Sequence, residues 1–152
     1  MRRLLLLFLL ILSVGLSACS FSTDFVVVND ANYPIQVIYK IKPFPSGSQN
    51  LEVEPRVASA ADLESRDSTK WTKLHPNQYR VDQPNRTVTV TLHAREALLI
   101  TSMSNYTADK VKDFPIEAVS IKGAAGEMTF TGEKARQAFQ YVSTVLYKLT
   151  YK

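Results

Sequence analysis

The chain has 152 residues, with 18 basic and 14 acidic side chains and a formal net charge of +4 at pH 7. This length fits one domain that buries a substantial core, so no second domain is required. The modest excess of positive charge argues against a nucleic-acid partner, and the single cysteine excludes an internal disulfide and a thiolate metal site.

Residues 1–18 have the layout of a secretory signal peptide. Arg2 and Arg3 precede an unbroken apolar run, Leu4 to Leu12, and small side chains then lead to Cys19. A membrane-spanning helix needs about 20 apolar residues, so this run is too short to cross a bilayer. A positive start, a short apolar core and small residues at the end instead predict a targeting segment that is removed.

The end of this segment, Leu16-Ser17-Ala18-Cys19, resembles the lipobox of bacterial lipoproteins. The resemblance implies diacylglycerol on the Cys19 sulfur, cleavage just before Cys19, and acylation of the freed amine by a fatty acid such as palmitate. The thioether requires a nucleophilic sulfur, which a cysteine supplies. Ser20 lacks the aspartate associated with inner-membrane retention in enteric bacteria. The resemblance therefore implies a lipid anchor in the outer membrane that faces the periplasm, with the inner membrane and the cell surface as alternatives.

Residues 19–24 are predicted to be a short tether, and residues 25–152 a single β-rich periplasmic domain. Phe25 to Val28 is an apolar, β-branched run, and Tyr33 to Lys42 alternates between apolar and polar side chains. Residues 29–32, which separate these two strands, are rich in Asn and Asp. This arrangement predicts a hairpin.

The segment from Pro43 to Asn85 carries weaker signals. Two prolines and a glycine interrupt the strand pattern at residues 43–48, and an edge strand is predicted around Val57. Ser59, followed by Asp62, resembles a helix cap and predicts one or two helical turns. A long irregular segment inside a small domain is either functional or contains elements that the pattern does not show.

Strong strand signals return in the second half of the chain. Alternating or continuous apolar patterns predict strands at residues 87–92, 96–103, 116–122, 127–131 and 145–152. The strand at 96–103 is apolar on both faces and is expected to be central. The strands at 116–122 and 127–131 flank a glycine-rich turn and are expected to form a hairpin.

Residues 132–143 change to a helical period, which predicts one amphipathic helix whose buried face is formed by Ala135, Ala138, Phe139 and Val142. Many short strands and one helix near the C-terminus favour a mainly β fold. The expected architecture is a small antiparallel β-sandwich, and an immunoglobulin-like arrangement is one form that such a sandwich takes. The alternative is an α+β domain with the helix packed on one antiparallel sheet.

No pattern in the sequence indicates catalytic, cofactor-binding or metal-binding residues. The two histidines, His75 and His93, have no metal-ligand spacing, and no nucleophile elbow is present. Trp71, Tyr79 and His75 lie in or beside the irregular segment and are the predicted contacts with a partner or ligand, because aromatic side chains are enriched at binding surfaces.

These observations favour a non-enzymatic lipoprotein that acts as a structural or accessory protein-interaction module of the cell envelope. The membrane and another envelope protein are then its expected partners. A periplasmic module that binds a glycan or another small ligand is the alternative. A hydrolase whose residues the sequence does not reveal is a third hypothesis, because catalytic triads are defined by geometry and not by sequence position.

Overall fold

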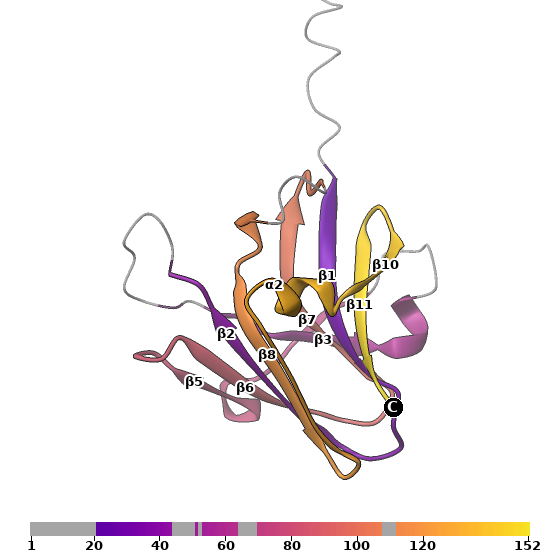
Figure 1. Ribbon diagram of the computed structural model, residues 1–152. Helices are drawn as coiled ribbons and strands as arrows, with labels where there is room; N and C mark the ends of the chain where they lie inside the picture. The colour runs from indigo at the N-terminus through magenta and orange to yellow at the C-terminus, as the bar shows by residue number, and fades with distance from the viewer. Residues whose placement is uncertain (1–20, 44–50, 52, 64–69, 108–111) are drawn as a thin grey trace, which may run out of the picture.

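The computed structural model describes residues 21–43, 51, 53–63, 70–107 and 112–152 (Figure 1). The predicted signal peptide, Cys19 and most of the predicted break at residues 43–48 lie outside these residues. In the described part of the chain, no helix has the length and apolar character needed to cross a membrane.

Two sheets make up the domain. The order of strands in the six-stranded sheet is β10 (Gln140–Ser143), β11 (Leu146–Tyr151), β1 (Ser22–Asn29), β7 (Glu96–Ser104), β3 (Arg56–Ser59) and β4 (Thr72–Lys73). The order in the five-stranded sheet is β5 (Tyr79–Asp82), β6 (Thr87–Leu92), β2 (Ile35–Ile41), β8 (Ile116–Gly123) and β9 (Gly126–Thr131). Every pair of neighbours is antiparallel except β1 and β11. The predicted mainly β fold, consistent with a small β-sandwich, is confirmed.

The main core is formed by the inward-facing side chains of both sheets. Strand β2 alternates as predicted, with Ile35, Val37, Tyr39 and Ile41 buried, and β6 buries Val88, Val90 and Leu92. Strands β8 and β9 form the predicted hairpin, and Met128 and Phe130 of β9 pack against the core. Because side chains alternate along a strand, burying one row forces the intervening residues outward.

A second apolar cluster covers the outer face of the six-stranded sheet. Val26 and Val28 of β1 and Ala97 of β7 are buried there, and Trp71 and Leu63 pack against them. The other rows of the same two strands, which include Phe25, Val27 and Leu98, belong to the main core. Strands β1 and β7 are therefore buried on both faces, and the prediction of a central strand at residues 96–103 is confirmed.

Phe25 is the centre of an aromatic cluster near the start of β1. Its ring centroid lies 4.9 Å from that of Tyr147 in a stacked arrangement, 5.1 Å from Tyr106 and 4.8 Å from Phe114. The guanidinium of Arg136 lies over the Tyr147 ring, 5.0 Å from its centroid. Rings at these separations attract one another beyond their burial, so this end of the domain is firmly held.

The predicted hairpin of residues 25–28 and 33–42 is wrong. Strand β1 lies between β11 and β7, whereas β2 lies between β6 and β8 in the other sheet. Residues 30–34 therefore carry the chain from one sheet to the other. The reason is that the distant strands β7 and β11 already pair with both edges of β1, so no edge of β1 is left for β2.

The predicted helix at residues 132–143 is shorter than expected. Helix α2 spans Glu133–Gln137, and Ala135 and Phe139 are buried as predicted, but residues 140–143 form strand β10 and Val142 is exposed. The predicted turns after Ser59 are the 3₁₀ helix η1 (Ala60–Leu63), and a second 3₁₀ helix, η2, spans Pro76–Gln78.

Candidate functional site

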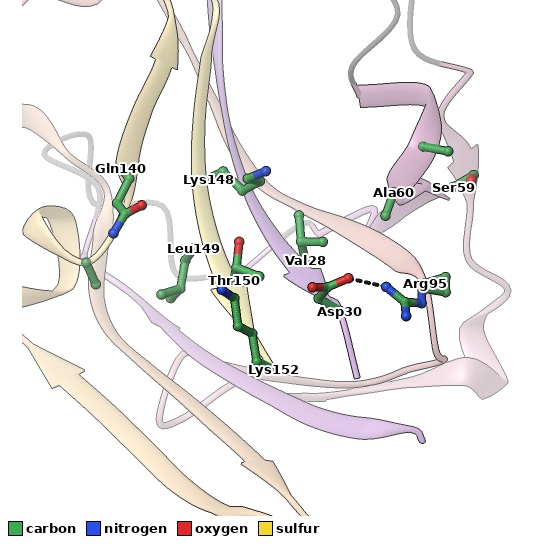
Figure 2. Close-up of a pocket in the computed structure, with 12 residues that line it drawn as sticks. Val28, Asp30, Ser59, Ala60, Arg95, Gln140, Lys148, Leu149, Thr150 and Lys152 are labelled. Carbon is green, nitrogen blue, oxygen red and sulfur yellow. Dashed lines mark hydrogen bonds and ion pairs between the residues drawn. The ribbon is translucent and has the colours of Figure 1, made fainter. Parts of the chain in front are cut away.

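A groove of about 710 Å³ runs over the outer face of the six-stranded sheet, and we call it the sheet groove (Figure 2). Val28 of β1 and Lys148 and Thr150 of β11 line its middle, Ser59 and Ala60 line one side, and Gln140 of β10 lines the other. Side chains at i and i+2 share a face of a strand, so the inward positions of Leu149 and Tyr151 place Lys148 and Thr150 on the outer face.

The 3₁₀ helix η1 builds one side of the sheet groove. Its first residue, Ala60, donates its backbone N–H to the carbonyl of Arg95 at 2.8 Å, which fixes the start of the helix next to the β6–β7 turn. Ala60 and Leu63 also pack on the second apolar cluster. This side of the groove is thus held by a hydrogen bond and by the packing of partly buried apolar side chains.

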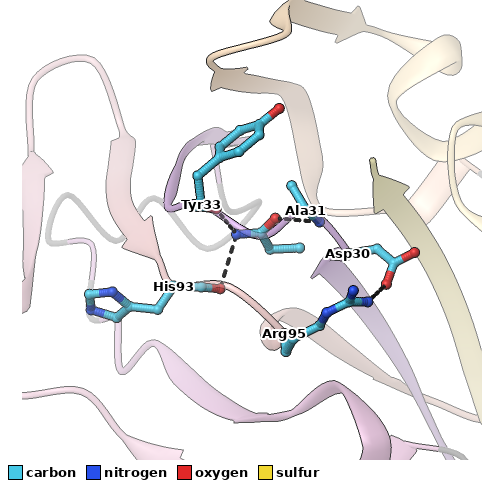
Figure 3. Close-up of polar contacts among 6 residues, drawn as sticks. Asp30, Ala31, Tyr33, His93 and Arg95 are labelled. Carbon is cyan, nitrogen blue, oxygen red and sulfur yellow. Dashed lines mark hydrogen bonds and ion pairs between the residues drawn. The ribbon is translucent and has the colours of Figure 1, made fainter.

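An ion pair between Asp30 and Arg95 closes one end of the groove (Figures 2 and 3). Arg95 lies in the β6–β7 turn with φ of 63°, a left-handed conformation that is uncommon outside glycine. Its N–H donates to the carbonyl of Asn29 at 3.0 Å, so the last residue of β1 holds the turn.

The fully buried side chain of Asn29 organises the same corner. Its Nδ2 group donates to the carbonyls of Tyr33, Leu92 and His93 at 2.8, 3.2 and 3.0 Å, and its Oδ1 accepts the N–H of Ala31 at 3.1 Å. Figure 3 shows Tyr33 and His93 on two separate segments of the chain, and Leu92 is the last residue of β6. One side chain therefore joins the β1–β2 connection to the end of β6.

The charges of the sheet groove are mostly positive. Lys148, Lys152 and Arg95 line it against one carboxylate, that of Asp30, which is already paired with Arg95. Among the described residues, neither Lys148 nor Lys152 makes an ion pair. The groove can therefore attract a carboxylate or another anionic group. Of the described residues, those that line the groove include no histidine, no cysteine and no aromatic side chain.

The structure does not bring the three predicted contact residues together. Trp71 is half-buried against the second apolar cluster, Tyr79 packs on the main core from β5, and His75 is exposed at the start of η2. None of the three lines the sheet groove. Trp71 comes nearest to it, because the cluster that Trp71 covers includes Val28 and Ala60, which also line the groove.

Tyr79 has a structural role that the sequence does not indicate. Its hydroxyl donates to the carbonyl of Val53 at 3.4 Å, and it neighbours the buried Tyr39. Burial raises the pKa of the Tyr39 phenol, and Tyr79 adds to this shift.

In the described part of the chain, no group of three His, Cys, Asp or Glu side chains is placed to hold a metal ion.

The residues that form the groove were not identified as a site by sequence reasoning. The alternation of residues 145–152 does place Lys148, Thr150 and Lys152 on one face of a strand. Nothing in the sequence, however, indicates that this face adjoins β1, η1 and Arg95, which lie far away along the chain.

Comparisons with protein-family models, with curated proteins and with solved structures found no match to this chain. The fold class is therefore established by the structure alone. Over the described residues, it is a mainly β domain of two antiparallel-rich sheets with one short α-helix, two 3₁₀ helices and no closed barrel.

Proposed function

We propose that the chain is a bacterial lipoprotein that is held on the outer membrane through Cys19 and acts, without catalysis, as a protein-interaction module in the periplasm. The lipobox resemblance of residues 16–19 supports the anchor. Strand β1 begins at Ser22, earlier than the predicted start at Phe25, so only Ser20 and Phe21 separate Cys19 from the sheet. An extended chain advances about 3.3–3.6 Å per residue, which keeps the domain at the membrane surface.

The sheet groove is the observation that carries the interaction role. Lys148 and Lys152 make no ion pair with another described residue and favour an acidic segment of a partner, and the open position of the groove on an outer sheet face suits a polypeptide. In the described part of the chain, β10 pairs only with β11, so its other edge offers backbone groups for an added strand. Complementary charge speeds association and selects the partner more than it adds affinity.

A module for a small anionic ligand is the second candidate, because a volume of about 710 Å³ lies within the range of ligand pockets. Such pockets are lined mainly by apolar and aromatic side chains. The described residues that line the sheet groove offer no aromatic ring on which a sugar could stack, so the protein partner is the first candidate.

The proposal is tested by site-specific photo-crosslinking in the intact bacterium. A photoreactive residue at Thr150, in the groove, should capture one envelope protein, whereas the same residue at Thr91, exposed on the other sheet, should not. Lys148→Glu should reduce this capture about tenfold or more, because it reverses the charge that attracts the partner. The matched change Lys134→Glu, on α2 and outside the groove, should leave capture unchanged.

Equal capture from Thr150 and Thr91, or equal effects of the two lysine changes, would contradict the groove as the docking surface. Fatty-acid labelling tests the anchor separately. Cys19→Ser should abolish incorporation and leave the signal peptide uncleaved, because no sulfur is available for the thioether.

A further inference from the structure

Three large apolar side chains are exposed on the β10–β11 hairpin. Tyr141, Val142 and Val145 are 63%, 49% and 50% exposed. We call residues 141–145 the hairpin tip. The stretch from Gln140 to Leu146 contains no charged residue. Large exposed apolar side chains that are grouped together mark a surface that contacts something other than water.

The hairpin tip lies beside the first residues of β1. The N–H of Asp24 donates to the carbonyl of Val145 at 2.9 Å, and the buried Thr23 hydroxyl donates to the carbonyl of Thr144 at 3.0 Å. Figure 1 shows the turn between β10 and β11 at the same end of the molecule as the start of β1. The tip is therefore next to the end of the domain to which Cys19 is joined.

The tip is held firmly on the domain. The ring of Tyr141 lies 5.5 Å from that of Tyr147, which in turn stacks on Phe25 at 4.9 Å. The pairing of β10 with β11 shifts register between Tyr141 and Ser143, so Val142 lies in a β-bulge and has no register partner on β11. The exposed apolar side chains therefore lie on the short end of a hairpin and not on a broad, flat sheet face.

We infer that the hairpin tip inserts into the lipid headgroup region of the membrane that holds the protein. The inference rests on the proposed Cys19 anchor. With two residues between Cys19 and Ser22, the bilayer surface lies within roughly 10 Å of the start of β1.

A small apolar hairpin end can enter a lipid interface without a matching surface on the other side. A protein partner would instead require a broad complementary face, since stable interfaces bury about 800 Å² on each partner. Tyrosine is also enriched where membranes meet water, because its ring is apolar and its hydroxyl is polar.

Lipid quenching of tryptophan fluorescence tests the inference on the full lipidated protein. The protein is purified from bacteria fed a labelled fatty acid and placed in phosphatidylethanolamine–phosphatidylglycerol vesicles with or without brominated acyl chains. A single tryptophan is introduced as Val145→Trp in a Trp71→Phe background. Val142→Trp serves as a second probe in case the first variant is poorly folded.

The control is Ala125→Trp in the same background. Ala125 is exposed in the β8–β9 turn, and the next residue, Gly126, accepts a hydrogen bond from Tyr151, which pairs with the last residue of β1, Asn29. The control probe therefore lies at the end of the domain away from the hairpin tip (Figure 1).

Brominated lipid should quench the Val145→Trp emission about twofold or more, because this side chain would lie within the membrane interface. The Ala125→Trp emission should be nearly unchanged, because that side chain would lie outside the membrane. If the protein carries the fatty-acid label but brominated lipid quenches neither the Val145→Trp nor the Val142→Trp emission, the inference is overturned and the anchor still stands. If those probes were instead shielded from aqueous acrylamide, a protein partner or a second copy would be the occupant. Absence of the label would refute the anchor, and the inference with it.

Discussion

Asn29 is the polar side chain on which the junction between the two sheets depends. It is fully buried, and its amide contacts three carbonyls and one backbone N–H. Two of these carbonyls, those of Leu92 and His93, lie more than 60 residues away along the chain. Buried carbonyls without a donor are costly, so this one residue determines where the chain leaves β1.

Asn29→Ala should lower the free energy of unfolding by about 2–4 kcal/mol, because it leaves several buried backbone groups without partners. Urea unfolding followed by Trp71 fluorescence measures the loss. The matched change Asn32→Ala affects an exposed residue of the same connection and should cost less than about 0.5 kcal/mol. Similar losses for the two variants would show that the Asn29 amide is not the organising contact.

At the scale of elements, residues 132–143 show where a periodic pattern misleads. Ala135 and Phe139 occupy helical positions and are buried, but the backbone leaves the helix after Gln137. Strand β10 then pairs with β11, where Gln140 lies opposite Lys148 and Tyr141 opposite Tyr147. Val142 fits the helical spacing only by coincidence, because strand pairing with β11 outweighs local preference.

Phe139→Ala should lower the free energy of unfolding by about 3–5 kcal/mol, since it removes a buried ring that packs against Phe25 and Phe114. Val142→Ala should change it by less than about 0.5 kcal/mol, because that side chain is half exposed. Denaturant unfolding of both variants compares the two positions. A loss below about 1 kcal/mol at Phe139 would show that α2 does not cover the core.

At the scale of the whole molecule, the parallel pairing of β1 and β11 determines which surfaces lie near the start of β1. Strand β11 places the hairpin tip beside the start of β1 and places Lys148 and Thr150 beside Val28. The apolar tip and the basic groove therefore lie on one sheet, at different distances from the point where the chain leaves the domain.

Lengthening the connection to Cys19 tests whether this arrangement matters. A twenty-residue Gly/Ser insertion between Ser20 and Phe21 spans roughly 25 Å on average and leaves β1 intact. We expect lower capture from Thr150 and weaker lipid quenching at Val145→Trp, with unchanged denaturant unfolding. Undiminished capture with the longer tether would indicate a partner that does not lie at the membrane surface.

Most strands were predicted from sequence because their information is local. Side chains alternate along any strand, so Ile35, Val37 and Tyr39 had to share a face once the segment was extended. The predicted pairing of strands was less reliable. The β8–β9 hairpin was found because its strands are adjacent in the chain, whereas β1 and β2, also adjacent, belong to different sheets.

By itself, the sequence determined the strand-rich fold class and the inward rows of most strands, and it supplied the resemblance of residues 16–19 to a lipobox on which the proposed anchor rests. Tertiary structure alone decided that β1 pairs with β11, that Asn29 joins two distant loops, and that Lys148, Ala60 and Arg95 line one groove. The direction of a side chain follows from the local backbone. The choice of neighbouring strand depends instead on which distant segments bury each other's apolar faces, and that is a property of the complete chain.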